Sequence, residues 1–120
     1  MKLQYLLTAE PGARWFRAYY RQNPSLNIEK AVSSLQQTER LLREQPLAGR
    51  RFEDRDEVRE RKISGTVFSL LYTVADDTIW IIDIRDQRGF RSAEAINSFN
   101  QELRERFRID EASDDRTRRK

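Results

Sequence analysis

Cysteine and histidine are both absent from this 120-residue sequence, and each absence excludes a class of chemistry. Without cysteine the chain can form no disulfide framework and offers no thiolate nucleophile, which is typical of a protein from a reducing compartment. Without histidine it lacks the side chain that most often serves as a general base near pH 7 and most often binds metals. Thiol-based and histidine-based catalysis are therefore excluded.

Long apolar runs and the common catalytic motifs are absent as well. No run approaches the roughly 20 residues that a membrane-spanning helix needs, and the N-terminal residues lack the pattern of a secretory signal. We therefore expect a cytoplasmic protein with no membrane partner. The sequence also has no glycine-rich phosphate loop, no nucleophile elbow and no metal-ligand spacing, so we expect neither a metal nor a cofactor.

Charged residues, by contrast, are abundant and make up 36% of the chain. The 23 positive and 20 negative side chains give a net charge of +3. Because no unbroken basic tract is present, the local arginine clusters leave two interpretations open: a polyanionic partner, or a solvated surface held by salt bridges. The chain length and the 38% of hydrophobic residues suit one domain with a single core.

Three runs rich in β-branched and aromatic residues predict an antiparallel meander, around which the rest of the chain is organised. These runs cover residues 59–63, 66–75 and 78–84. Asp76-Asp77 forms a two-residue hairpin link, and Gly65 supplies the other turn. Alternation predicts two sets of buried side chains, one on each strand: Phe68, Leu70, Tyr72 and Val74, then Trp80, Ile82 and Ile84.

The N-terminal half predicts a fourth strand over residues 2–8 and two helices over 12–22 and 25–44. Aromatic residues spaced four apart form a stripe on the first helix, which is typical of packing on a sheet. Asn23-Pro24 ends that helix and caps the next one, so the two helices should be close to antiparallel. Residues 50–57 are a charged connection in which only Phe52 can anchor to the core.

The C-terminal part predicts a helix over residues 93–107 with Ser92 as its cap. Its apolar residues repeat every three or four positions, so the helix either covers the second face of the sheet or offers a stripe to a partner. Residues 108–120 are nearly devoid of large apolar side chains and predict a frayed or disordered tail. The expected fold is α+β, with one domain over residues 1–107 that includes the extra C-terminal helix at about 92–107.

The segment VRERKISGTVFSLLYTVADDTIWIIDIRDQR, residues 58–88, resembles the RelE/ParE superfamily of bacterial toxins from type II toxin-antitoxin systems, the plasmid stabilisation family. The resemblance covers about residues 3–91. The matching features are Val58-Arg59, Gly65, Leu71-Tyr72, Asp76-Asp77 and Gln87-Arg88. The resemblance implies an N-terminal strand, an antiparallel helical hairpin and a three-stranded meander. It also implies a cognate antitoxin as partner, and contact with operator DNA only through that antitoxin.

Two departures from the family pattern bear on the target. In members that cleave mRNA on the ribosome, an arginine commonly follows the aromatic residue of the central strand, whereas here Phe68 is followed by Ser69. Those members also tend to have a tyrosine or histidine beyond the last strand, where this chain has Phe90 and Arg91. Both departures favour the ParE-like branch, whose members poison DNA gyrase by binding rather than by catalysis. The alternatives are a metal-independent mRNA endonuclease that works on the translating ribosome, and a non-toxic binding module of the same fold.

The candidate site residues are basic under each of these interpretations. A nuclease would use cations to stabilise the phosphorane, and the candidates are Arg59, Arg61, Lys62, Arg85 and Arg88. Candidates for contact with the target or the antitoxin are Arg50, Arg51, Arg59, Arg85 and Arg88. The acids Asp83 and Asp86 bracket Arg85, which predicts a local ion pair.

Overall fold

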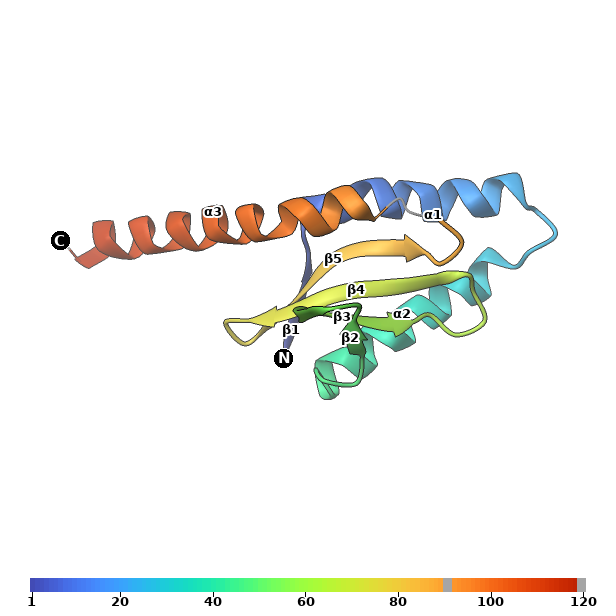
Figure 1. The fold of residues 1–120 in the computed structure, drawn as a ribbon, viewed down its shortest axis with the longest axis horizontal. Coiled ribbons are helices and arrows are strands. Elements are labelled where there is room, and N and C mark those ends of the chain that lie inside the picture. Colours follow the sequence, from blue (N-terminus) through green and yellow to red (C-terminus); the bar gives the residue numbers. More distant parts are fainter. Residues whose placement is uncertain (90–91, 119–120) are drawn as a thin grey trace.

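The structure, a computed structural model, describes residues 1–89 and 92–118 and contains one five-stranded sheet with helices on both faces (Figure 1). The elements in chain order are β1 (Lys2–Tyr5), the short 3₁₀ helix η1 (Leu7–Ala9), α1 (Glu10–Gln22), α2 (Ile28–Glu44), β2 (Arg50–Phe52), β3 (Arg55–Lys62), β4 (Phe68–Ala75), β5 (Thr78–Asp86) and α3 (Ala93–Arg118). The strand order is β1-β5-β4-β3-β2. This confirms the predicted α+β class and the order of strand, two helices, meander and C-terminal helix.

The meander of β3, β4 and β5 is antiparallel, as predicted. Asp76 and Asp77 form its second turn with φ angles of 53° and 54°, so both residues adopt the left-handed conformation that a tight hairpin needs. Gly65 has a φ of 73° in the first turn. The N-terminal strand joins differently, because β1 pairs in parallel with β5. Parallel strands need a long connection between them, because the chain must cross back to the end of the sheet where the first strand began. The helices between β1 and β5 are part of such a connection.

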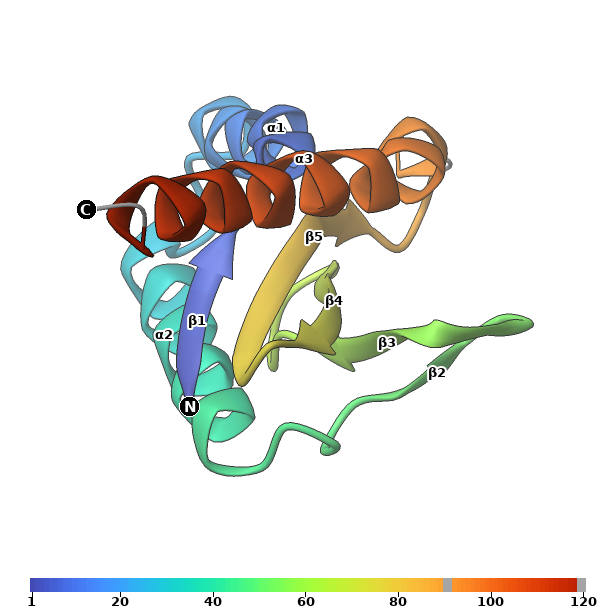
Figure 2. The ribbon, with the colours of Figure 1, turned by 90° about the vertical axis from the view of Figure 1, so that its left-hand side faces the viewer.

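Residues 50–57 do not form the predicted irregular connection. They contain β2 and the start of β3, which pair antiparallel and reach away from the helices at the end of the sheet opposite β1 (Figure 2). Glu53, with a φ of 51°, lies in the turn between the two strands. Phe52 is buried and joins the core, as predicted. The sequence of residues 50–57 does not reveal these strands, because Phe52 is the one buried residue among them.

The two N-terminal helices run in opposite directions (Figure 1), as predicted, but the second begins later than expected. Its cap is Asn27, whose Oδ1 accepts a hydrogen bond of 3.1 Å from the backbone N–H of Lys30. Asn23 instead ends α1, where its side chain donates to the carbonyl of Tyr19 at 2.8 Å. The prediction that Asn23 caps the second helix was therefore wrong.

The face of the sheet covered by α1 and α2 holds the first hydrophobic core. Phe68, Leu70 and Tyr72 are fully buried there, which confirms three of the four predicted side chains of the middle strand. The Phe16 ring of α1 meets the Phe68 ring edge-on at a centroid distance of 5.0 Å, so the aromatic stripe packs against the sheet. Val74, the fourth of these predicted side chains, is 37% exposed, so its predicted burial was wrong.

The opposite face holds a second core, which α3 covers. Trp80 and Ile82 are buried there with Phe99 and Leu103 of α3, so internal packing of the C-terminal helix is confirmed. Ile84 belongs to the first core instead, which corrects its predicted face. The reason is a shift in register between β4 and β5 that leaves Ile82 without an opposite residue and reverses the alternation beyond it.

The C-terminal helix is longer than predicted, because α3 continues to Arg118 and projects past the sheet (Figure 1). The boundary between a toxin domain over 1–107 and a tail over 108–120 stays a prediction. The hydroxyl of Ser92 makes no hydrogen bond, so Ser92 does not cap α3 with its side chain. Phe90 and Arg91 lie outside the described residues. Within the described part of the chain, no helix is long and apolar enough to cross a membrane.

Candidate functional site: a basic groove on the sheet

The strand register divides the candidate cations between the two faces of the sheet. Residues paired across antiparallel strands share a face, so Arg59 lies on the same side as its partner Tyr72 in the first core. Lys62 and Arg85 lie on the other side, because both pair with Ser69. Arg50 joins them there through its pairing with Glu60, which is itself paired with Leu71 of the second core. Sequence alone could not make this division.

A groove of about 760 Å³ lies where these side chains gather. Arg50, Lys62 and Arg85 line it together with Glu60 and Gln87, and Arg61 reaches it as well. Arg50 and Lys62 are exposed, and neither side chain makes a hydrogen bond or an ion pair with the described part of the chain. These two side chains are therefore available to a partner.

Glu60 lines the groove and connects Ser69 with Arg85 through hydrogen bonds. Its Oε2 accepts hydrogen bonds from the hydroxyl of Ser69 at 2.6 Å and from Nη1 of Arg85 at 2.7 Å. The guanidinium of Arg85 also stacks over the Phe52 ring, 5.3 Å from its centroid. The partner of Arg85 is therefore Glu60 of β3, which corrects the predicted local pairing with its sequence neighbours. Glu60 therefore partly neutralises the charge of Arg85 in the groove.

Arg59 and Arg61 hold the loop between α2 and β2 in place. Arg59 donates to the carbonyl of Gly49 at 2.7 Å, and Arg61 donates to the carbonyl of Ala48 at 3.2 Å. The hydroxyl of Tyr72 completes this attachment, because it accepts from the N–H of Gly49 and donates to the carbonyl of Pro46, both at 2.8 Å. Burial raises the pKa of the Tyr72 hydroxyl above its usual value, so it remains protonated and able to donate. These two arginines thus have structural contacts.

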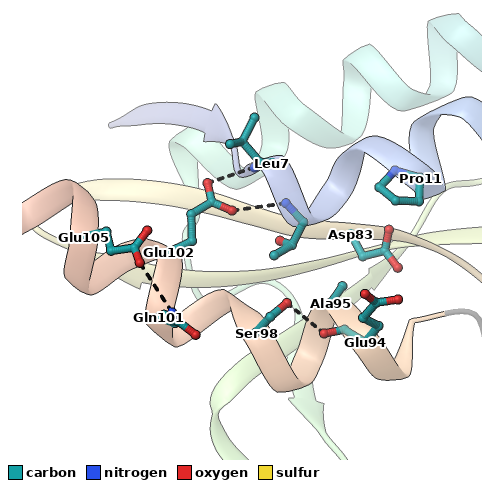
Figure 3. Close-up of a pocket in the computed structure, with 10 residues that line it drawn as sticks. Leu7, Pro11, Asp83, Glu94, Ala95, Ser98, Gln101, Glu102 and Glu105 are labelled. Carbon is teal, nitrogen blue, oxygen red and sulfur yellow. Dashed lines mark hydrogen bonds between the residues drawn. The ribbon is translucent and has the colours of Figure 1, made fainter.

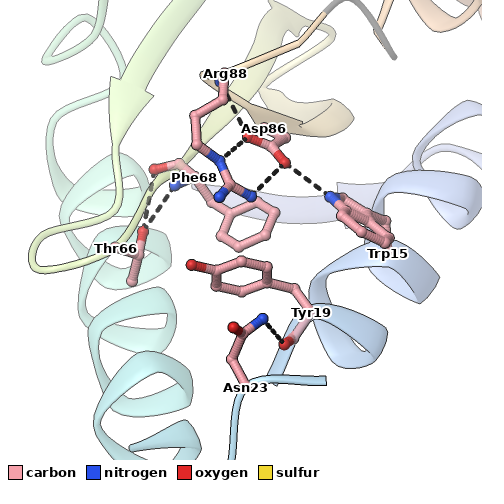
Figure 4. Close-up of polar contacts among 7 residues, drawn as sticks. All are labelled: Trp15, Tyr19, Asn23, Thr66, Phe68, Asp86 and Arg88. Atoms are coloured by element: carbon pink, nitrogen blue, oxygen red, sulfur yellow. Dashed lines mark hydrogen bonds and ion pairs between the residues drawn. The ribbon is translucent and has the colours of Figure 1, made fainter. Parts of the chain in front are cut away.

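Arg88 belongs to a separate cluster at the end of β5 (Figure 4). Its Nε and Nη2 donate to the carboxylate of Asp86 at 3.0 and 2.9 Å, and Nε1 of Trp15 donates to the same carboxylate at 2.8 Å. The guanidinium lies 4.7 Å from the centroid of the Tyr19 ring. Hydrogen bonds from Arg88 and then Trp15 hold the pKa of Asp86 well below its usual range. This cluster fastens the last strand to α1 rather than contributing to the groove.

Arg51 lies at the exposed hairpin of β2 and β3. Its Nη1 pairs with Asp56 at 2.7 Å, and their side chains are 59% and 85% exposed. Because water screens such a pair, it contributes little to stability. The structure thus brings Arg50, Lys62 and Arg85 together and separates them from Arg51, Arg59 and Arg88.

The groove can attract anions, but none of its described lining residues is free to act as a general base. Glu60 already accepts two hydrogen bonds and balances Arg85. Sequence reasoning missed Glu60, whose only signal was its alternation with Arg59 and Arg61 on β3. Among the residues that the structure describes, no group of three or more acidic side chains could hold a metal ion. The geometry therefore supports binding of an anionic or acidic partner.

A comparison with protein families matches residues 13–89 to the ParE toxin of type II toxin-antitoxin system, parDE. This span covers more than half of the chain and runs from α1 to just beyond β5, so it includes the whole groove. It leaves out β1 and α3. Comparisons with curated proteins and with solved structures gave no significant match.

Proposed function

Because this chain belongs to the ParE toxin family of type II toxin-antitoxin systems, for which a cognate antitoxin is the expected partner, we propose that it inhibits growth by binding and poisoning DNA gyrase. One observation carries the choice of target. Ser69 stands where the mRNA-cleaving relatives commonly have an arginine, and it is fully buried. Its hydroxyl is hydrogen-bonded to Glu60, so this position supplies no cation to the groove.

The rest of the groove supports action by binding. Cleavage of RNA through its 2′-hydroxyl needs a base for that hydroxyl and positive charge for the phosphorane. The groove has positive charge from Arg50 and Lys62, but its one carboxylate, Glu60, is engaged by Ser69 and Arg85. A groove of this kind suits an acidic protein surface or the phosphates of DNA held in an enzyme.

We expect Arg50 and Lys62 to make the contact with the target, because both are exposed and without partners among the described residues. Contacts between exposed charges weaken as salt rises, since counterions screen them within about 10 Å at 0.1 M. Binding of the target should therefore fall with ionic strength. Arg85 should contribute less, because Glu60 balances its charge at 2.7 Å.

The antitoxin would bind through an apolar surface, and exposed apolar side chains are present at the start of α2. Leu26, Ile28 and Val32 are 44%, 41% and 37% exposed at the start of this helix and just before it. Of these three, Leu26 lines a groove of about 650 Å³ that also borders the turn containing Gly65. An amphipathic segment of the antitoxin could place apolar anchors there and acidic side chains toward the arginines. Operator DNA would then be reached only through the antitoxin.

A DNA cleavage assay with purified gyrase tests the proposed target. Gyrase, supercoiled plasmid and the purified protein are incubated and then denatured, so that any trapped enzyme leaves linear DNA. We expect linear DNA with the parent protein and much less with an Arg50→Glu, Lys62→Glu double variant at moderate salt. Arg40→Glu on α2 is the matched control, because Arg40 is exposed and without a described partner. Absence of linear DNA at every salt concentration would contradict the proposal.

A second candidate function is cleavage of mRNA on the translating ribosome. The observation in its favour is the gathering of Arg50, Arg61, Lys62 and Arg85 around one groove, because such a set of cations could hold an RNA phosphate. Purified protein added to a translating extract would then cut mRNA at defined codon positions. Charge reversal at Arg50 and Lys62 should abolish those cuts.

A further inference from the structure

A second cleft, of about 380 Å³, lies between η1, the start of α1 and the first turns of α3 (Figure 3). Its lining differs in charge from that of the basic groove. Four of the residues that line it are acidic: Asp83, Glu94, Glu102 and Glu105. None of its described lining residues is basic, although the chain as a whole has a net charge of +3. The cleft is thus a local concentration of negative charge on a basic protein.

Asp83 is the unusual member of this set. It is only 3% exposed, yet its Oδ1 has no hydrogen-bond partner and none of the ion pairs among the described residues includes it. Its carboxyl lies between Pro11 and Ala95 in the cleft (Figure 3). The hydroxyl of Ser92, which is 4% exposed, also lacks a hydrogen-bond partner. Buried polar groups without partners are uncommon, and a buried carboxylate is costly without a cation.

The Asp83 carboxyl is charged at neutral pH, which increases the free-energy cost of burying it without a cation. Burial raises the pKa of Asp83 from 3.8 to about 6. At pH 7.5 the carboxyl is therefore mostly charged. Glu102 already has a cation, because its Oε2 pairs with Nε of Arg106 at 3.1 Å. Its two oxygens also accept hydrogen bonds from the N–H groups of Leu7 and Thr8 at 2.8 and 3.1 Å.

The other acids are spread along one side of α3. Glu94, Ser98, Gln101 and Glu105 follow one another at intervals of four, three and four residues, so they share one face of the helix. With a rise of 1.5 Å per residue, Glu94 and Glu105 are about 16 Å apart along the axis. Leu7, Pro11 and Ala95 give the cleft apolar surface between its charged parts. The cleft is therefore acidic toward both ends and partly apolar along its length.

We propose that this cleft binds a linear organic polycation, with one ammonium group at Asp83 and Glu94 and another near Glu105. The methylene chain between the ammonium groups would lie along Leu7, Pro11 and Ala95. A free polyamine has this chemistry in one molecule, and two lysine side chains of a partner protein would supply the same two ammonium groups, each on its own methylene stem. The site is independent of the gyrase proposal, because none of its residues lines the basic groove.

Titration calorimetry with spermidine as the probe, at pH 7.5 and low salt, tests the site with the full-length chain. We expect saturable binding of one equivalent, weakened at least tenfold by Asp83→Asn and also by the Glu94→Gln, Glu105→Gln double variant. Glu44→Gln, an exposed glutamate on α2, is the matched control and should bind as the parent does. The second set of variants keeps the test valid if Asp83→Asn alters the local fold.

Measuring the antitoxin affinity of the same variants distinguishes the two sources of the cation. If the cation is a free polyamine, spermidine binds and the variants hold the antitoxin as tightly as the parent. If it is a pair of lysine side chains of the antitoxin, the variants weaken the complex at least tenfold and spermidine competes with the antitoxin. Spermidine binding and antitoxin binding that both remain unchanged in Asp83→Asn and in the double variant would overturn the proposal.

Discussion

The buried carboxyl of Asp83 should cost this protein stability at neutral pH, and replacing it with the neutral amide of the same size should recover that stability. Asp83 lies on β5 beneath α1, where a Cβ on Gly12 would collide with its Oδ1, so the space around it is tight. Asp83→Asn keeps the volume and removes the charge. The hydroxyl of Ser92, which lacks a hydrogen-bond partner, can accept from the new amide.

The sign and size of the effect follow from the two protonation equilibria. The pKa of Asp83 is raised from 3.8 to about 6 in the folded protein, so the folded state binds the proton more tightly than the unfolded state. The resulting stabilisation is fully present below pH 3.8 and is lost as pH rises through about 6. A shift of about two units corresponds to ~3 kcal/mol at most. Asp83→Asn lacks this dependence on pH.

Urea unfolding of both proteins between pH 4 and 8, in the absence of polycations, measures the difference directly. We expect Asp83→Asn to be more stable by up to ~3 kcal/mol at pH 7.5. The two free energies of unfolding should converge as pH falls toward 4, because the parent carboxyl is then protonated in the folded state. A difference that is constant across this range would show that the charge of Asp83 is not the cause.

Two further predictions concern packing and hydrogen bonding, and both are checked by urea unfolding midpoints at pH 7.5. Trp80→Ala should lose about 3–5 kcal/mol, because it removes a ring that packs between β5 and α3, and an unchanged midpoint would contradict the assignment of the second core. Tyr72→Phe should lose about 1–3 kcal/mol, because the N–H of Gly49 and the carbonyl of Pro46 lose their partner. Tyr20→Phe is its control and should change little, since the Tyr20 hydroxyl makes no hydrogen bond among the described residues.

The meander was predictable because its signal is local. Alternating β-branched and aromatic residues define the strands, and Asp76-Asp77 defines the hairpin through its tolerance of positive φ. The same local reasoning placed Trp80 and Ile82 in the interior. It failed at Ile84, because a shift in register between neighbouring strands leaves no mark in the sequence of either strand.

The site was less predictable because it depends on pairing between distant residues. The arginines were visible in the sequence, but only the register shows that Arg85 shares a face with Lys62 while Arg59 lies on the face of the first core. Glu60 was missed for the same reason, since its partner lies 25 positions away in the chain. The short strand β2 was also missed, because three charged or aromatic residues carry no periodic signal.

Induction of this ParE-family chain in cells without its antitoxin distinguishes action on gyrase from action on mRNA. Within minutes of induction, total RNA and chromosomal DNA are sampled in parallel. We expect DNA breaks and a DNA-damage response while ribosome-bound mRNA stays intact. Rapid cuts in mRNA at defined codon positions, without DNA damage, would contradict it.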